Sequence, residues 1–419
     1  MNYPDSVRYL YSLGNEVKSA KLGLETISAL LEALDNPQRA CRFVHVAGTN
    51  GKGSTCAMIE SGLRAAGIRT GLYTSPHLAE PTERIQIAGH PVTFEQFAGA
   101  FDEVHEAAED LLRDGVIEYH PTYFETVTAM AFVLFKQLEA GTVALEVGLG
   151  GRLDATNVVT PALSVITRVD FDHEALLGRS IEAIASEKAG ILKPGIPAVL
   201  APQRPEAEAT LLARAEVTGS TISRAADWSV EDCSLNPRGS AFVIRRKGEA
   251  ELHLQCPLAG EHQVENALTA AIALHELGIA REAIERGIAA AHWPGRLELV
   301  SSQPEIILDG AHNPSGARAL VRYIERFYAD RKVTVIYGAM RDKAVVEMTG
   351  ILFPAADTVI ATAAAQDRAT RPETIRELSG RPGVLITQTV ADALKLAEDA
   401  DVVFVTGSLF VVAEARALL

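Results

Sequence analysis

A lysine flanked by glycines stands in the segment GTNGKGS, at residues 48–54. The apolar run RFVHVA (42–47) precedes it, and a helical pattern begins near Ser54 and ends near Gly67. Glycines at a strand-to-helix turn let backbone N–H groups approach an anion, while the helix dipole and Lys52 add positive charge. The segment therefore predicts a loop that binds a polyphosphate.

The spacing of this loop departs from the usual pattern G-x-x-x-x-G-K-[ST]. Val46 stands where the first glycine is expected, and Gly53 stands where serine or threonine is expected. A flexible turn without a ligand is therefore an alternative for this segment taken alone. A dinucleotide-binding loop is disfavoured, because the G-x-G-x-x-G spacing is absent and a lysine suits a triphosphate better.

Strand-like runs alternate with amphipathic stretches along most of the chain, which is typical of parallel βαβ units. The first series of runs lies at 42–47, 142–148, 163–169 and 197–201. A second series lies at 305–310, 332–338, 357–362, 383–387 and 401–407. Between the two series, SAFVIRR and AELHLQC flank KGE, as the strands of an antiparallel hairpin would.

We therefore predict an α/β fold with two domains. Residues 1–293 are expected to form an N-terminal P-loop-type domain with a mostly parallel sheet and a small antiparallel subdomain. Residues 294–297 are the expected linker, since Trp293-Pro294-Gly295 breaks both kinds of element. Residues 298–419 are expected to form a C-terminal Rossmann-like α/β domain.

The composition excludes several classes of function. The chain has 419 residues and a formal net charge of −15, which disfavours nucleic acid and anionic membranes as partners. No stretch is long and apolar enough to span a bilayer, and the first residues lack the features of a signal peptide. The four cysteines form no CxxC pair, which argues against a zinc ribbon or a disulfide framework. We expect a cytoplasmic protein that acts as a monomer.

Ten segments together resemble the folylpolyglutamate synthase and dihydrofolate synthase family, the folate-modifying relatives of the Mur ligases. GTNGKGS is similar to that family's form of the P-loop, and the order and spacing of the others span nearly the whole chain. The remaining segments are LYTSPHL (72–78), PTYFETVTAMAF (121–132), LEVGLGGRLDATN (145–157), TRVDFDHEALLG (167–178), EKAGILKPG (187–195), HQVENALTA (262–270), PGR (294–296), LDGAHNP (308–314) and TGSL (406–409).

The resemblance implies an ATP-dependent amide ligation. A substrate carboxylate attacks the γ-phosphate of ATP to give an acyl phosphate, and the amino group of L-glutamate then displaces phosphate. The implied acceptors are dihydropteroate and reduced folates, as in the bifunctional bacterial enzymes. Several anions meet in this reaction, and Mg²⁺, lysine, arginine and backbone N–H groups can offset their repulsion.

The resemblance also implies roles for individual residues. ATP contacts fall on Gly48, Thr49, Asn50, Gly51, Lys52, Gly53, Ser54, Asn266, Arg296 and Asp309. Ligands of two magnesium ions fall on Ser75, Glu146 and His173. Pteroyl contacts fall on Leu22, Gly23, Leu24, Thr122, Tyr123, Phe124, Glu125, Arg152, Leu153 and Asp154. The implied catalytic residues are Lys52, His312 and Lys188, the last as a lysine carbamylated by CO₂.

Residue type alone leaves other roles open at several of these positions. A carboxylate that ends a strand, as Glu146 does, is equally expected to be solvated, and Ser75 and His173 alone would be a helix cap and an ordinary histidine. Tyr123 and Phe124 could stack on a pterin, yet aromatic residues on an apolar helix face usually belong to the core. A lysine on a helix that begins near Ser180 is usually solvated or paired with an acid.

Two other functions remain open. A Mur-type peptidoglycan ligase would share the chemistry but use a nucleotide-sugar acceptor, and its P-loop usually has threonine where this chain has Gly53. A nucleotide-dependent switch or assembly factor would hydrolyse ATP without ligating anything. These alternatives differ in whether glutamate and a pteroyl acceptor stimulate phosphate release.

Overall fold

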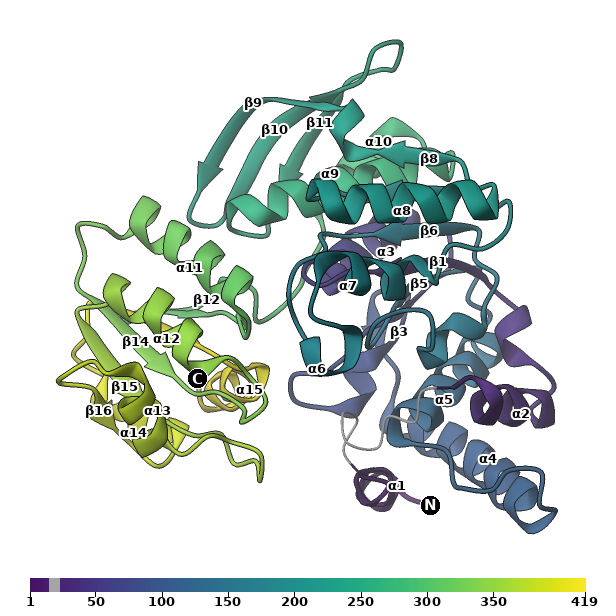
Figure 1. Cartoon of the computed structure of the whole chain (residues 1–419), viewed down its shortest axis with the longest axis horizontal. Helices are drawn as coiled ribbons and strands as arrows, with labels where there is room; N and C mark the ends of the chain where they lie inside the picture. The colour runs from purple at the N-terminus through teal and green to yellow at the C-terminus, as the bar shows by residue number, and fades with distance from the viewer. Residues whose placement is uncertain (15–22) are drawn as a thin grey trace. The chain divides into compact units, whose positions relative to one another are not determined.

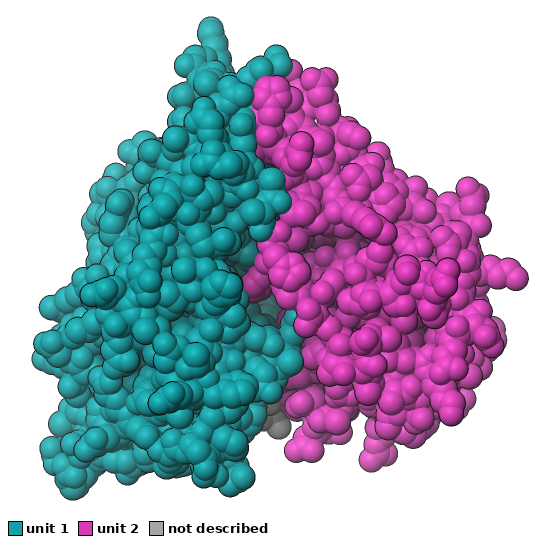
Figure 2. All heavy atoms as spheres, turned by 180° about the vertical axis from the view of Figure 1, so that it is seen from behind, with its two compact units in different colours: residues 1–229, 244–252, 265–290 teal, residues 230–243, 253–264, 291–419 magenta. Residues whose placement is uncertain are grey.

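The computed structural model describes residues 1–14 and 23–419 of the chain (Figure 1). They form two compact units, coloured separately in Figure 2. Unit 1 comprises residues 1–229, 244–252 and 265–290, and unit 2 comprises residues 230–243, 253–264 and 291–419. The predicted α/β class is confirmed. The linker at 294–297 stays a prediction, because the units separate after residue 290 and also share the segment between 229 and 265.

Unit 1 is built on an eight-stranded sheet with the order β4-β3-β2-β5-β1-β6-β7-β8. Its strands are β1 (Arg42–Ala47), β2 (Thr70–Tyr73), β3 (Ile85–Ile87), β4 (His90–Pro91), β5 (Thr142–Glu146), β6 (Leu163–Ile166), β7 (Ala198–Leu200) and β8 (Ile222–Arg224). All neighbours pair in parallel except at β3 and β4, which are antiparallel at one edge. The central strands are continuous apolar runs, as expected of a parallel sheet buried on both faces.

Helices cover this sheet and supply two buried apolar clusters. They are α1 (Tyr3–Ser12), α2 (Glu25–Ala33), α3 (Lys52–Ala65), α4 (Phe94–Arg113), α5 (Tyr123–Gln137), α6 (Glu174–Leu177), α7 (Ile181–Ala189), α8 (Pro205–Thr218) and α10 (Arg281–Ala289). One cluster joins α4 and α5 to β1 and β5 and includes Phe101 and Phe132. The other joins α7 and α8 to β6 and β7 and includes Ile184 and Leu211.

Several helix starts follow from capping chemistry. Ser180 caps α7 by accepting from the Ala183 N–H, as expected for a helix beginning there. The helix after the P-loop begins at Lys52 rather than near Ser54, because Gly51 takes the left-handed conformation and ends the turn earlier than the apolar pattern indicated. Short 3₁₀ turns lie at Pro37–Arg39, Pro81–Arg84, Ala155–Val158, Ala225–Asp227 and Phe353–Ala355.

A three-stranded antiparallel sheet, order β11-β10-β9, forms the small subdomain (Figure 1). Its strands are β9 (Ser229–Asn236), β10 (Gly239–Arg245) and β11 (Leu252–Cys256). The predicted hairpin around KGE is confirmed as the β10–β11 pair, whereas β9 was not predicted. The three strands and the following helix α9 (Glu261–Glu276) are each divided between the two units.

Unit 2 contains the six-stranded sheet β12-β13-β17-β14-β15-β16. Its strands are β12 (Glu298–Ser302), β13 (Glu305–Leu308), β14 (Val333–Tyr337), β15 (Thr358–Ala361), β16 (Leu385–Ile386) and β17 (Val402–Thr406). Its helices are α11 (Pro314–Phe327), α12 (Val345–Leu352), α13 (Pro372–Ser379), α14 (Val390–Leu396) and α15 (Leu409–Leu418). Only β12 is antiparallel, and each parallel strand is followed by a helix, so the predicted Rossmann-like domain is confirmed. In the part of the chain described here, no helix has the length and apolar character needed to cross a bilayer.

Helices α3 and α10 of unit 1 approach each other at a pair of glycines. A Cβ added to Gly287 would lie 2.3 Å from the Cα of Gly62, where backbone rather than a flexible side chain blocks it. We expect Gly287→Ala to lower the free energy of unfolding by about 1–3 kcal/mol, because the helices must separate to admit the methyl group. Urea denaturation measures this.

Gly99 is the matched control, because it lies on helix α4 of the same unit and a Cβ there meets nothing within 4 Å. Gly99→Ala should leave the urea midpoint unchanged or raise it, since alanine favours a helix by up to about 1 kcal/mol over glycine. Equal midpoints for Gly287→Ala and Gly99→Ala would contradict the close approach.

Candidate functional site

Four neighbouring strands of unit 1, in the order β2-β5-β1-β6, end at the same edge of the sheet. The P-loop follows β1, Ser75 follows β2, Glu146 ends β5, and His173 follows β6. The register places Val46, two residues before the P-loop, directly opposite Glu146. Loops at the carboxyl edge of a parallel sheet are where α/β proteins bind ligands, so the topology gathers these predicted site residues.

The P-loop is fixed by hydrogen bonds to the segment after β6. The Thr49 N–H donates to the Arg168 carbonyl (2.9 Å), and the Thr49 hydroxyl donates to the Asp170 carbonyl (2.8 Å). The same hydroxyl accepts the Asp170 N–H (3.0 Å). These contacts restrict the conformation of the loop, which lowers the entropic cost of binding a ligand.

Two of the P-loop glycines have no room for a side chain. A Cβ on Gly48 would lie 1.8 Å from the Thr167 hydroxyl oxygen. Gly51 has φ +87°, and a Cβ there would lie 2.2 Å from Oδ1 of Asn266. The structure thus brings Asn266, one of the predicted ATP contacts from α9, against the loop.

Lys52 is the first residue of α3, so it lies at the positive end of the helix dipole. Its Nζ donates to the Thr49 carbonyl (3.3 Å), which folds the side chain back over the loop. The first N–H groups of an α-helix have no partners within the helix and can bind an anion. Lys52 and these N–H groups are the positive groups that a triphosphate site needs to bind phosphate oxygens.

Glu146 is a nearly buried carboxylate, 4% exposed, at the end of β5. One of its oxygens accepts the Ser75 backbone N–H at 3.2 Å, so the two residues predicted as magnesium ligands are neighbours. A carboxylate and a hydroxyl are the hard oxygen donors that Mg²⁺ prefers.

His173 lies in the loop after β6 with φ +50°, a left-handed conformation that is uncommon for histidine. Its N–H donates to Oδ1 of Asp172 (2.9 Å). Backbone strain of this kind persists where surrounding structure imposes it, often at functional sites. The carboxylate of Asp172 lies beside His173 in this loop, and the sequence had not indicated a role for it.

Lys188, in the last turn of α7, is 3% exposed, and its Nζ donates to the Gly48 carbonyl of the P-loop at 2.9 Å. Burial, reinforced by the positive charge of Lys52, lowers the pKa of Lys188 to about 7. Three carboxylates oppose this shift: Asp172, Asp154 and Glu187. A lysine with this pKa is about half neutral at pH 7, whereas an ordinary lysine is less than about 0.1% neutral.

The predicted pteroyl segment TYFE begins helix α5. Thr122 and Glu125 form a capping box, in which the Glu125 carboxylate accepts the Thr122 N–H (2.9 Å) and hydroxyl (2.8 Å). The Tyr123 ring is buried and stacks on Tyr11, with 5.7 Å between ring centroids and 9° between planes. Phe124 is partly buried and is the aromatic ring of this segment that keeps exposed surface.

The segment RLD is also tied into the fold. The Asp154 carboxylate accepts from the Leu149 N–H (2.8 Å) and from the Thr156 N–H (3.0 Å) and hydroxyl (2.5 Å), and burial raises its pKa. Arg152 forms an ion pair with Glu187 (3.0 Å) on α7. Leu153 is partly exposed between them. These contacts shape the loop that follows Glu146.

The third predicted pteroyl segment lies at the edge of the described residues. Leu22 is outside them, whereas Gly23 and Leu24 directly precede α2. A Cβ on Gly23 would lie 2.3 Å from a carboxylate oxygen of Glu25, a contact that the flexible side chain can relieve.

Unit 2 holds three of the predicted site residues together after β13. The Asp309 carboxylate accepts the N–H groups of Leu297 and Ala311 (3.1 Å each), and burial raises its pKa against the opposing effect of Arg296. Arg296 Nη1 and His312 Nδ1 both lie within hydrogen-bond distance of the Gly310 carbonyl, at 3.3 and 2.8 Å. Arg296, Asp309 and His312 therefore form one constellation within this unit.

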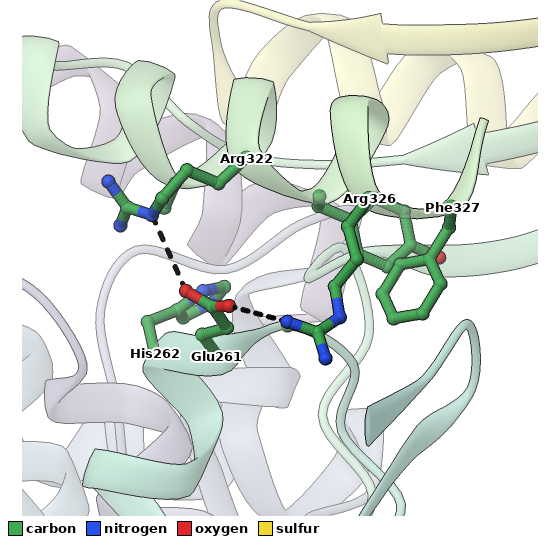
Figure 3. Close-up of a pocket in the computed structure, with 8 residues that line it drawn as sticks. Glu261, His262, Arg322, Arg326 and Phe327 are labelled. Carbon is green, nitrogen blue, oxygen red and sulfur yellow. Dashed lines mark hydrogen bonds and ion pairs between the residues drawn. The ribbon is translucent and has the colours of Figure 1, made fainter. Parts of the chain in front are cut away.

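A small cavity in unit 2 lies where Glu261 pairs with two arginines of α11, Arg326 (3.1 Å) and Arg322 (3.6 Å) (Figure 3). Burial, with the charges of Arg296 and Arg322, lowers the pKa of the neighbouring His262 to about 4, so its imidazole is neutral. The cavity volume of about 10 Å³ admits about one water molecule. As it stands it is too small for a nucleotide or a pteroyl group.

Comparison with known proteins identifies the family. The Mur ligase middle domain matches residues 46–274, more than half of the chain, and the glutamate ligase domain of Mur ligases matches residues 295–409. A folylpolyglutamate synthase of Lacticaseibacillus casei is 36% identical over 431 residues, covering 100% of this chain and 99% of the relative. The chain belongs to the folylpolyglutamate synthase and dihydrofolate synthase family.

Other members of this family are similar to this chain in sequence and in structure. The dihydrofolate synthase/folylpolyglutamate synthase of Bacillus subtilis is 35% identical over 409 residues, 94% of each chain. The folylpolyglutamate synthase of Mycobacterium tuberculosis complexed with ADP and AMPPCP superposes with a TM-score of 0.92 at 31% identity, covering 100% of this chain and 99% of that one. Escherichia coli FolC in complex with DHPP and ADP superposes with a TM-score of 0.89 at 33% identity, covering 100% of this chain and 97% of that one.

Membership of the folylpolyglutamate synthase and dihydrofolate synthase family makes this chain an ATP-dependent ligase that uses Mg²⁺ with ATP. The residues present fit both requirements. Lys52 and the first N–H groups of α3 can hold phosphate oxygens, and Glu146 offers a nearly buried anionic oxygen beside Ser75. The assignment of individual residues to ATP, magnesium and substrate remains a prediction.

The environment of Lys188 generates a test for carbamylation. We expect ¹³C-labelled bicarbonate at pH 7 to form a carbamate on Lys188, because a buried, half-neutral amine can attack CO₂. The ¹³C NMR spectrum should show one carbamate signal that disappears in Lys188→Arg. Lys193→Arg is the matched control, because burial also lowers the pKa of Lys193, yet its Nζ binds the Asn157 carbonyl away from the P-loop. A signal that survives in Lys188→Arg, or its absence in the parent protein, would refute the prediction.

Proposed function

We propose that this chain ligates L-glutamate to the carboxylate of a pteroyl substrate, and that one active site accepts both dihydropteroate and reduced folates. The observation that carries the proposal is the convergence of the P-loop, Glu146 and Lys188 at one edge of the unit 1 sheet. Named relatives support it, since the Escherichia coli relative was solved with DHPP and ADP and the Bacillus subtilis relative is named for both activities.

The P-loop residues have the first task, which is to bind and orient the triphosphate. Backbone N–H groups at the start of α3 would hold phosphate oxygens, and Lys52 would leave the Thr49 carbonyl to follow the γ-phosphate. Asn266 would bound the nucleotide on the side of Gly51. In this arrangement the charge that develops during transfer is offset by groups already in place, which is the main source of catalysis in phosphoryl transfer.

Glu146, Ser75 and His173 would hold two magnesium ions, which lower the repulsion between the phosphates and the attacking carboxylate. The buried Glu146 carboxylate would supply the negative charge, and the Ser75 N–H bond would orient it. A carbamate on Lys188 would add an anionic oxygen beside the P-loop. The substrate carboxylate would then attack the γ-phosphorus, and ADP would leave as the acyl phosphate forms. The amino group of glutamate, after losing a proton, would displace phosphate from the acyl carbon without a covalent intermediate on the protein.

The acceptor segments divide their roles. Thr122, Glu125 and Asp154 use their polar atoms to cap and shape the local backbone, so we infer that they position the acceptor site. Phe124 is the better candidate to stack on a pterin, because Tyr123 is already packed against Tyr11. In unit 2, Arg296 and Asp309 are proposed to contact the nucleotide, and His312 is proposed to take part in catalysis.

We also infer that the enzyme works as a monomer in the cytoplasm. The four cysteines are free thiols, which suits a reducing compartment, and ATP is the co-substrate. Sedimentation analysis of the purified protein would measure its oligomeric state.

The choice of acceptor separates this proposal from its competitors. We expect phosphate release with ATP, Mg²⁺ and glutamate to depend on dihydropteroate or tetrahydrofolate, and not on a UDP-muramyl compound. Lys52→Ala should abolish the ligation without loss of folding, whereas the exposed Lys247→Ala should leave it unchanged. Activity on tetrahydrofolate alone would reduce the proposal to a single activity, and acceptor-independent hydrolysis would favour a nucleotide switch.

Removal of the Glu146 charge tests the magnesium site. We expect Glu146→Gln to raise the magnesium concentration required for half-maximal activity by at least about tenfold, because the amide keeps the shape but loses the anionic oxygen. Titration of activity with Mg²⁺ at saturating ATP measures this. Glu32→Gln, at an exposed position on α2, should behave as the parent protein. An unchanged magnesium requirement for Glu146→Gln would contradict the metal role.

A further inference from the structure

Two histidines and a glutamate of unit 1 meet at a place that the ligase chemistry does not use. His105 and Glu109 lie one turn apart on α4, and His120 lies in the segment just before α5. The Glu109 carboxylate oxygen Oε1 is 3.8 Å from His105 Nδ1 and 3.5 Å from His120 Nε2. The three side-chain atoms all lie within 4.8 Å of one another.

The orientation of His120 exposes a lone pair to this cluster. A carbonyl oxygen can only accept, so the contact between His120 Nδ1 and the Pro121 carbonyl (3.0 Å) places the ring proton on Nδ1. Nε2 of the neutral imidazole is then an acceptor, and it faces Glu109 and the hydroxyl of Tyr9 (3.2 Å). A hydrogen bond from the far ring nitrogen to a carbonyl is the usual support of a metal-binding histidine.

His105 presents the second nitrogen. Its Nδ1 is buried and has no hydrogen-bond partner among the residues that the structure describes. The ring is fixed by stacking on Phe101, with 5.4 Å between centroids and 16° between planes, and by Tyr9 at 4.6 Å. A buried polar atom without a partner is costly, and a bound ion would satisfy it.

We propose that His105, Glu109 and His120 bind a zinc ion, with water or the Tyr9 hydroxyl as the fourth ligand. Ligand atoms about 2.0–2.2 Å from a tetrahedral zinc are about 3.3 Å apart, so the observed separations require only a small contraction around the ion. Glu109 is 52% exposed and can move inward, which also gives the ion access from solvent. The two imidazoles favour Zn²⁺ over Mg²⁺, which prefers oxygen ligands.

Zinc at this site would join α4 to the segment that leads into the Thr122 cap of α5. Tyr9 of α1 adjoins the same cluster, because its hydroxyl lies 3.5 Å from the Glu109 carboxylate. Zinc would therefore stabilise the packing of α1, α4 and α5, and its binding should raise the melting temperature in proportion to zinc occupancy. This inference does not depend on the proposed ligase function.

The test uses the full-length protein after removal of metals with a chelator. Zinc binding is measured by competition with a chromophoric chelator in excess Mg²⁺, in the Glu146→Gln background, so that the magnesium site contributes little. We expect one zinc ion per chain, with at least about tenfold weaker binding in His105→Ala and in His120→Ala. His90→Ala, which removes an exposed histidine from strand β4 of the same unit, is the matched control.

Cobalt provides a second readout that activity does not influence. Co²⁺ bound by two imidazoles and a carboxylate in a tetrahedral site should give intense visible absorption, and this spectrum should be lost in His120→Ala and kept in His90→Ala. Zinc binding in His105→Ala and His120→Ala that is as strong as in the parent protein, or the absence of zinc binding in the parent protein, would overturn the proposal. A zinc-dependent rise in melting temperature that persists in His120→Ala would overturn it too.

Discussion

The P-loop of this protein is held in its conformation by contacts from three other parts of unit 1. The segment after β6 bonds to Thr49, the amide of Asn266 fills the space where a Gly51 side chain would lie, and the Lys188 amine binds the Gly48 carbonyl. None of these contacts is local in sequence. Any change that moves α7 or α9 against the sheet would therefore alter the loop, although it leaves every residue of GTNGKGS in place.

The sequence predicted the elements that carry strong periodic signals. Buried parallel strands such as β1 and β14 are continuous apolar runs, and each was expected at its observed position within a residue or two. The strands that escaped prediction carry weaker patterns. β2 is the four-residue run TGLY, and β9 is mostly exposed, so neither shows an apolar face from which a strand can be read.

The sequence indicated which residues belong to the candidate site, but it did not indicate how those residues are packed and hydrogen-bonded. The resemblance to the family singled out Lys188, whereas spacing alone indicated a solvated or ion-paired helix residue, because burial depends on how α7 packs under the P-loop. The contact between His45 and Thr156 also depends on packing between distant parts of the chain. Since the Thr156 hydroxyl donates to Asp154, the neutral His45 must donate to Thr156 (2.8 Å), and this chain links residues 111 positions apart. No local pattern reports such a contact.

Burial and the charge of a neighbouring lysine together determine the protonation state of Lys188. The chain is acidic overall, with a net charge of −15, yet the positive charge of Lys52 acts on Lys188 in a region with little water. Both lysines cannot easily be charged there, because two cations repel strongly where solvent screening is weak. Burial and this repulsion together lower the pKa of Lys188 and favour its neutral form. A carbamate on that amine would replace the repulsion between the lysines with attraction and place an anion beside the P-loop.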